Sequence, residues 1–201
     1  MAVRGPVCAV MVAVALSGCG STGSGNLEKS LVVDLPGFVA VAARPTPATL
    51  CDPDPTRPDL TPPGLPDELG TPVAVNYESA PVTLEAYAWE AADADEAGSL
   101  IDTATTSAAA CAWSSPSMRD LDGDGVPETP STEEQQVEPW SGAGWEGLRI
   151  LRTVPGTEQI DRRLVRADDI VLLVVVRADG DDPALLAAAD DYLSAVGDAL
   201  G

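Results

Sequence analysis

The chain has 201 residues, and its 32 acidic residues against 11 basic ones give a formal net charge of −21. This charge excludes electrostatic binding to nucleic acid or anionic lipid, since both need clustered cations. No histidine is present, which excludes Ser-His-Asp and Cys-His catalysis, histidine-ligated zinc and a histidine pH switch. An apolar fraction of 45% is enough for a packed core, so we expect a folded domain.

Residues 1–18 have the pattern of a lipoprotein signal peptide. Arg4 precedes an apolar stretch from Val7 to Leu16, which is shorter than the ~20 residues of a membrane-spanning helix. The stretch ends in Leu16–Cys19 (LSGC), which is similar to the lipobox of bacterial lipoproteins. That similarity implies cleavage before Cys19 and acylation of its sulfur by diacylglycerol, with palmitate-type chains. The alternative is an ordinary signal peptide followed by a chance cysteine.

A lipidated Cys19 predicts an extracytoplasmic protein on the outer face of the cell membrane. Two or more acyl chains hold a protein durably at a bilayer. Residues 19–33 are predicted to be the lipidated cysteine and a flexible tether, because the segment GSTGSGNLEKS is rich in Gly and Ser and reaches at most ~35 Å. Residues 34–201 are then expected to form one domain.

The remaining cysteines predict a disulfide. Cys8 leaves with the signal peptide and Cys19 is lipidated, so Cys51 and Cys111 are left. A cysteine pair in an oxidising compartment favours a disulfide, which would contribute roughly 4 kcal/mol by closing a loop of about 60 residues. The alternative is two free thiols. Two cysteines without histidine make no tetrahedral metal site.

Residues 44–72 contain nine prolines, and such a segment cannot form a helix interior or a central strand. We expect an ordered, extended covering segment that Cys51 attaches to the core. Strands are predicted at Val73–Tyr77 and Val82–Trp89, because apolar residues alternate with polar or aromatic ones in the second. A helix is predicted from Asp93 to Ala112, since its apolar residues recur at spacings of three and four and place Cys111 on the core side.

The last third of the chain predicts three strands and a closing helix. Two strands are expected at Trp145–Val154 and Ile160–Arg166. The seven consecutive aliphatic residues of Ile170–Val176 suit a central strand covered on both faces, or one whose second face binds a ligand. Asp182 is the predicted N-cap of the closing helix, with Pro183 at its first position.

The order of these elements predicts an α+β fold: an antiparallel sheet of about five strands with two packed helices and one disulfide. The cysteine in an N-terminal loop, the aromatic-ended strand and helix start AYAWEAADADEA, and the helix end AAACAW with Cys111 and Trp113 resemble the extracellular sensor domains of PknH-like mycobacterial kinases and related actinobacterial lipoproteins. The resemblance runs from Cys51 to Leu200. It implies a domain with a solvent-open cleft for a small ligand, and it supplies no catalytic residues.

Two features depart from the resemblance. The sensor domains of those kinases carry two disulfides, whereas one is expected here. We also expect no kinase domain and no transmembrane segment in this chain. Both departures weaken the case for direct signalling.

One motif has the form of a calcium loop. Aspartates at positions one, three and five, a glycine at six and a carbonyl at seven are the ligand pattern of such loops. The candidate ligands are Asp120, Asp122, Asp124, the Val126 carbonyl and Glu128. Ser131 stands where an EF-hand has its bidentate glutamate, and Pro127 disfavours the following helix. The alternative is a solvated acidic turn.

A ligand cleft is the other candidate site. Trp140 and Trp145 flank a Gly-rich turn and, with Tyr87, could line a cleft beside the sheet; the alternative is that the tryptophans cap the core. Thirty-two carboxylates without histidine give no specific catalytic pattern, so we expect no enzyme. The sequence predicts a non-enzymatic, sensor-like or small-ligand-binding envelope lipoprotein that needs no cofactor, with Ca²⁺ as a possible ligand. The alternative is a calcium-stabilised structural or protein-interaction module.

Overall fold

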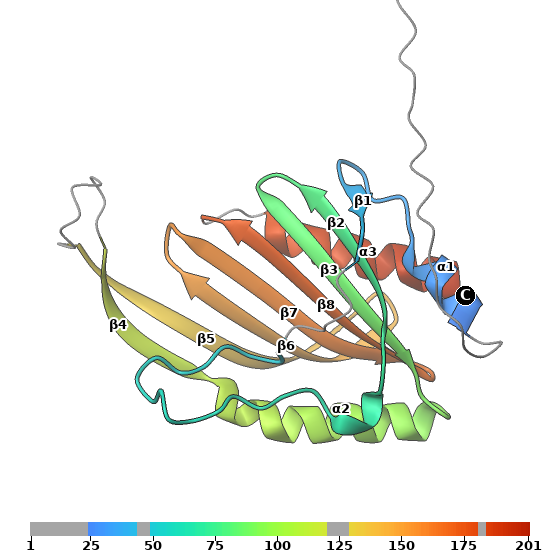
Figure 1. The fold of residues 1–201 in the computed structure, drawn as a ribbon, viewed down its shortest axis with the longest axis horizontal. Coiled ribbons are helices and arrows are strands. Elements are labelled where there is room, and N and C mark those ends of the chain that lie inside the picture. Colours follow the sequence, from blue (N-terminus) through green and yellow to red (C-terminus); the bar gives the residue numbers. More distant parts are fainter. Residues whose placement is uncertain (1–23, 44–48, 120–128, 181–183) are drawn as a thin grey trace, which may run out of the picture.

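The structure, a computed structural model, describes residues 24–43, 49–119, 129–180 and 184–201. In this part the chain forms one antiparallel sheet in the order β1-β2-β3-β8-β7-β6-β5-β4 (Figure 1). The strands are β1 (Val39–Val41), β2 (Val73–Ser79), β3 (Val82–Glu90), β4 (Trp113–Arg119), β5 (Thr129–Gly142), β6 (Trp145–Val154), β7 (Glu158–Ala167) and β8 (Ile170–Asp179). The α-helices are α1 (Ser24–Leu31), α2 (Ala94–Ala108) and α3 (Ala184–Leu200), and the short 3-10 helices are η1 (Asp67–Leu69) and η2 (Ala109–Cys111). No helix among the described residues is long and apolar enough to cross a membrane.

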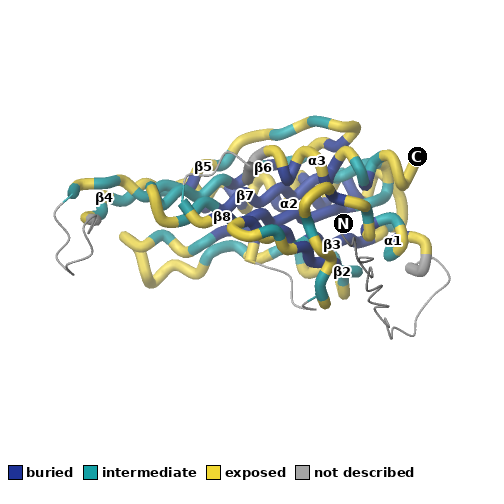
Figure 2. Tube along the Cα trace, turned by 90° about the horizontal axis from the view of Figure 1, so that it is seen from above, coloured by how far each residue is buried: buried dark blue, intermediate teal, exposed yellow. Residues whose placement is uncertain are grey.

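Strand β8 lies at the centre of the sheet because both of its faces are apolar. Alternate residues belong to two buried clusters: Val171, Leu173 and Val175 to the one that includes α2, and Leu172, Val174 and Val176 to the one that includes α3. All six side chains are 0% exposed, and the buried residues concentrate along the middle strands (Figure 2). The prediction of a central strand covered on both faces is confirmed.

Helix α2 begins where the sequence predicts, but it ends at Ala108, and the rest of the predicted helix is the 3-10 turn Ala109–Cys111. The Asp93 side chain accepts a hydrogen bond from the Glu96 backbone N–H (2.9 Å), which caps the first turn. Cys111 closes the following 3-10 turn and forms the predicted disulfide with Cys51. Leu50 and Cys51 are fully buried, so this end of the proline-rich segment is attached to the core as expected. Residues 44–48 of that segment and the predicted cap Asp182–Pro183 lie outside the described residues.

The α+β class, the antiparallel sheet, the packed helices and the disulfide are confirmed, whereas the prediction of about five strands is wrong because the sheet has eight. The strands that the sequence did not predict are β1, β4 and β5. β4 and β5 are polar and contain Pro116, Pro130 and Pro139. Proline is tolerated at a sheet edge, where fewer backbone donors are needed, and these strands form one margin of the sheet.

The tether predicted over residues 19–33 must also be corrected, because residues 24–31 form helix α1. Its Leu27 and Leu31 are buried in the cluster on the α3 side. The hydroxyls of Tyr77 and Tyr192 each lie 3.1 Å from the Leu31 carbonyl oxygen and donate to it. The two leucines, four residues apart in a Gly/Ser-rich segment, therefore pack into the apolar cluster on the α3 side. The sequence alone does not reveal this contact.

The buried tyrosines predict an alkaline loss of stability. Burial raises the pKa of Tyr192 well above its ordinary value, and burial also raises the pKa of Tyr77. The unfolded chain releases these protons near pH 10, so the stabilisation is complete below that pH and is lost as the pH rises toward the folded-state pKa. Tyr192→Phe should cost about 1 kcal/mol at pH 7 and flatten the decline above pH 10, as measured by urea unfolding. An unchanged alkaline slope in Tyr192→Phe would contradict this assignment.

Candidate functional site

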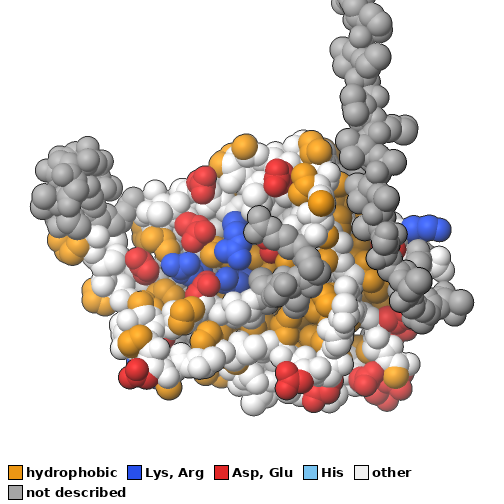
Figure 3. Space-filling view, in the orientation of Figure 1, with side chains coloured by type: hydrophobic (Ala, Val, Ile, Leu, Met, Phe, Trp, Pro, Cys, Tyr) orange, Lys and Arg blue, Asp and Glu red, His pale blue; other side chains and the backbone are white. Residues whose placement is uncertain are grey.

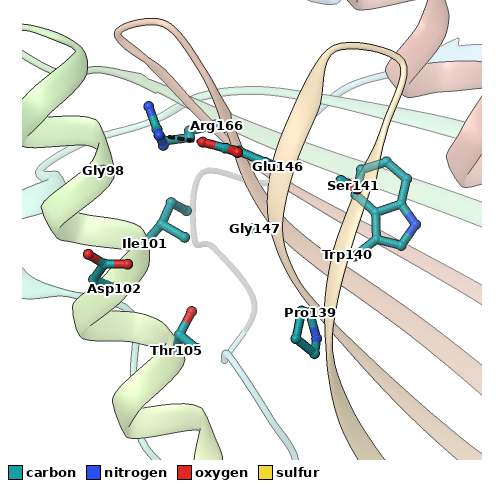
Figure 4. Close-up of a pocket in the computed structure, with 10 residues that line it drawn as sticks. All are labelled: Gly98, Ile101, Asp102, Thr105, Pro139, Trp140, Ser141, Glu146, Gly147 and Arg166. Carbon is teal, nitrogen blue, oxygen red and sulfur yellow. Dashed lines mark hydrogen bonds and ion pairs between the residues drawn. The ribbon is translucent and has the colours of Figure 1, made fainter.

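A groove of about 440 Å³ lies between helix α2 and the ends of strands β5, β6 and β7 (Figure 4). Its walls combine charged, hydroxyl, aromatic and apolar groups. The lining residues are Gly98, Ile101, Asp102 and Thr105 of α2, Pro139, Trp140 and Ser141 of β5, Glu146 and Gly147 of β6, and Arg166 of β7. A concave site of this size with a few polar groups is suited to a small ligand.

Strand register brings the polar groups of the sheet into this groove. Ser141 is paired with Glu146, and Glu146 is paired with Arg166, so the three side chains form one row on the face toward α2. The Arg166 Nη2 group donates to the Glu146 carboxylate, and the ion pair spans the end of the groove (Figure 4). The neighbouring strands therefore position one positive and one negative group together.

Gly98 of α2 lies beside the Arg166 side chain of this ion pair. A Cβ atom there would lie 3.7 Å from the Arg166 Cζ atom, an ordinary van der Waals distance. A glycine inside a helix costs about 1 kcal/mol relative to alanine, yet neither backbone conformation nor crowding requires one here. Local departures from good helix-forming sequence are expected at functional sites, so this glycine favours a role for the groove.

The β5–β6 turn fixes the other wall. Ala143 and Gly144 have φ angles of 51° and 82°, the positive values of a tight two-residue hairpin turn that follows the sheet twist. The Trp140 ring points away from α2 (Figure 4) and stacks under the Arg163 guanidinium, whose Cζ lies 4.7 Å from the ring centroid. Trp140 thus lines the groove near its backbone, while its ring is fixed on the opposite face.

The three aromatic residues predicted to line one cleft do not lie together, because Tyr87 is on the opposite face of the sheet from Trp140 and Trp145. Tyr87 is buried in the cluster on the α2 side, and its hydroxyl donates to Glu85 Oε2 at 3.0 Å. Trp145 is 2% exposed on the α3 side, where its Nε1–H donates to the Leu193 carbonyl at 2.9 Å. Strands β8 and β7 separate their strands, so of these residues only Trp140 contributes to the groove described above.

The predicted calcium ligands Asp120, Asp122, Asp124, Val126 and Glu128 lie outside the described residues, in the connection between β4 and β5. Cys19 also lies outside them. Within the described ranges, no group of three or more Asp, Glu, Cys or His side chains is placed to hold a metal ion.

The sequence did not indicate Gly98, Asp102, Thr105 or the Glu146–Arg166 pair as site residues. Each is ordinary in its own segment, and only the strand register and the packing of α2 bring them together. The sole local signal is a glycine in the interior of a predicted helix.

No protein-family model and no curated protein matches this chain. A search of solved structures finds the extracellular domain of PknH from Mycobacterium tuberculosis, with a TM-score of 0.45 and 12% sequence identity. The match covers 88% of this chain and 92% of that chain.

Replacing Gly98 with alanine should stabilise the protein. Because the added methyl group meets only the Arg166 side chain at 3.7 Å, Gly98→Ala should raise the free energy of unfolding by up to about 1 kcal/mol. Urea unfolding of the variant measures this directly. Gly147→Ala should have the opposite effect. The added Cβ would lie 2.2 Å from the Leu164 carbonyl oxygen, so this substitution should lower the free energy of unfolding. A loss of stability in Gly98→Ala would show that the groove is more tightly closed than described.

Proposed function

We propose that this chain is a lipid-anchored envelope protein whose domain binds a small ligand, in a sensor-like and non-enzymatic role, on the outer face of the membrane. The groove between α2 and the β5–β6 hairpin carries this proposal. It is concave, of ligand size, and combines an ion pair with exposed Asp102 and Thr105 side chains and apolar surface from Ile101.

The groove favours binding over catalysis. Its Glu146 carboxylate is ion-paired with Arg166, which suits it to orient a ligand more than to transfer a proton. The chain contains no histidine, and its only lysine, Lys29, belongs to α1 and not to the groove. Covalent catalysis needs a nucleophile that is hydrogen-bonded to a base. Among the described residues, neither the Ser141 nor the Thr105 hydroxyl of the groove is hydrogen-bonded to a carboxylate.

An unpaired strand edge next to the groove raises the question of peptide binding. β4 pairs with β5 only over Thr129–Gln135, so the stretch from 136 to 142 has a sheet neighbour on one side alone. Pro139 lies in the middle of this stretch and lacks an N–H group, a feature that discourages addition of another strand. A small ligand in the groove is therefore favoured over an extended peptide along the edge.

The anchor is supported by the LSGC sequence at 16–19 and by the disulfide, which is typical of extracytoplasmic proteins. Helix α1 begins at Ser24, five residues after Cys19. A link of this length spans at most about 18 Å, so a lipid on Cys19 would hold the α1 end of the domain close to the bilayer surface.

Lipidation is tested by Cys19→Ala in the full-length chain, expressed in a bacterium that processes lipoproteins and labelled with alkyne-palmitate. The variant should lose the label and leave the membrane fraction, because the acceptor sulfur is gone. Cys8→Ala is the matched control and should keep both, since Cys8 lies in the signal peptide. Undiminished labelling of Cys19→Ala would contradict the anchor.

Ligand binding in the groove is tested by an NMR screen of residues 20–201 with fragments of about 15 heavy atoms, for which a Kd of about 0.1–1 mM is expected. Hits should perturb the amide signals of Gly98, Ile101 and Thr105. Thr105→Trp should abolish these shifts by filling the groove, whereas Thr106→Trp, on the same helix but not lining it, should preserve them. The proposal fails if no fragment perturbs these signals or if the hits persist in Thr105→Trp.

A further inference from the structure

A second group of polar residues lies on the α2 face of the sheet, away from the groove. Arg152 of β6 and Arg177 of β8 are both paired with Ile160 of β7, so their side chains share one row. Arg162 occupies the next position on the same face of β7. Three neighbouring strands thus bring three of the ten arginines of a strongly acidic chain together, and basic side chains gather on this face in Figure 3.

One carboxylate, that of Asp52, already binds two of these arginines. Arg162 Nη1 lies 2.9 Å from Asp52 Oδ2, and Arg162 Nη2 donates to Asp52 Oδ1 at 3.0 Å. Arg152 Nη1 lies 3.8 Å from Asp52 Oδ2. One carboxylate thus lies against two guanidinium groups of the cluster, and a carboxylate or a phosphate is the kind of group that arginine binds with charge-assisted hydrogen bonds.

The covalent structure holds Asp52 in this place. The residue follows Cys51, which is bonded to Cys111. Its backbone N–H donates to Gln135 Oε1 at 3.0 Å, while Gln135 Nε2 donates to the Cys111 carbonyl. The disulfide and the buried glutamine therefore fix an internal carboxylate over the arginine cluster.

Among the described residues, the cluster of three arginines forms ion pairs with two carboxylates, those of Asp52 and Glu158. Arg152 makes a second ion pair with Glu158 at 3.3 Å, but the Arg177 side chain forms no ion pair or hydrogen bond with any residue that the structure describes. Its diagonal neighbour on β3, Glu85, accepts from the Tyr87 hydroxyl instead. Burial lowers the pKa of Arg162, and the charges of Arg177 and Arg152 lower it further while Asp52 opposes them.

Buried donors of the cluster are also unused. The Nε groups of Arg152 and Arg162 have no hydrogen-bond partner among the described residues, although the Arg162 side chain is 2% exposed. A buried donor without a partner is costly and calls for an explanation, such as an absent ligand.

The other face of the sheet offers an internal comparison. There Asp161 binds both Arg149 at 3.0 Å and Arg163 at 2.9 Å, and Glu138 and Asp190 add two further carboxylates. Two arginines thus share three carboxylates, an arrangement that needs no external anion. The cluster on the α2 face has three arginines and two carboxylates, Asp52 and Glu158.

We propose that Arg177, together with Arg152 and Arg162, binds an external oxyanion, namely the carboxylate or phosphate group of a ligand. A guanidinium is always charged and presents a planar fork of donors that matches both groups. The site is separate from the groove, because the groove lies at the Arg166 end of β7 and the cluster lies around Arg162. It therefore goes beyond the proposed function and stands or falls independently of it.

The test uses the mature chain with Cys19→Ser, which removes only the lipid attachment, and follows the arginine Nε–Hε signals by NMR. Inorganic phosphate and acetate are titrated in separate arms to about 20 mM, roughly twenty times the Kd expected for two charge-assisted hydrogen bonds, with chloride at matched ionic strength as the reference. A saturable shift of the Arg177 and Arg152 signals in either arm supports the site, and the arm that saturates first identifies the preferred group.

Arg177→Gln should weaken the anion affinity at least tenfold, while Arg57→Gln should leave it unchanged. Arg57 is the matched control because it is exposed and paired only with Asp54, and thermal melts check that both variants are folded. No saturable shift with either anion, or an equal shift in folded Arg177→Gln, would overturn the proposal and leave the arginines with the sole role of holding Asp52.

Discussion

The structure depends on strand β8, because a strand that is apolar on both faces must be covered on both. Helices α1 and α3 pack on one face, where Tyr77 of β2 and Tyr192 of α3 both donate to the Leu31 carbonyl of α1. The other face is covered by α2 and by the segment that the disulfide holds. Both candidate binding surfaces lie on this second face, the groove beside α2 and the arginine cluster further along the strands.

The two faces of the sheet differ in how their charged side chains are paired. On the α3 face the buried carboxylate of Asp161 is surrounded by arginines that have further acidic partners, so the network is self-contained. On the α2 face the Cys51–Cys111 bond and the Gln135 side chain hold Asp52 against its arginines. The same disulfide that secures the end of α2 therefore also sets the charge balance of the arginine cluster.

Periodicity predicted the elements whose patterns are set by local burial. The aliphatic run of β8, the alternation in β3 and the three-and-four spacing of α2 each record which faces are buried. β4 and β5 could not be predicted this way, because edge strands bury little and tolerate proline. Helix α1 was missed because its short apolar pattern gains stability only from packing against α3 and β2.

The candidate sites were harder to predict than the fold because they depend on register. The sequence placed Tyr87 with Trp140 and Trp145, yet β3 is not a neighbour of β5 or β6, and the Tyr87 ring lies on the opposite face of the sheet from the two tryptophans. The grouping of Arg152, Arg162 and Arg177 follows from pairing positions that no local pattern encodes. Of the sequence features considered, only the cysteine pair predicted a contact between residues far apart in the chain.

The account holds that the side chains packed between α3 and the sheet are closed to solvent, whereas both candidate binding surfaces on the α2 face are accessible. Solvent paramagnetic relaxation with a neutral gadolinium chelate tests it most directly. The account predicts strong relaxation of the Thr105 methyl and Arg177 Nε–H signals and almost none of the Val174 and Leu193 methyls, which are fully buried between α3 and the sheet. Equal protection of Arg177 and Val174, or strong relaxation of the Leu193 methyls, would contradict it.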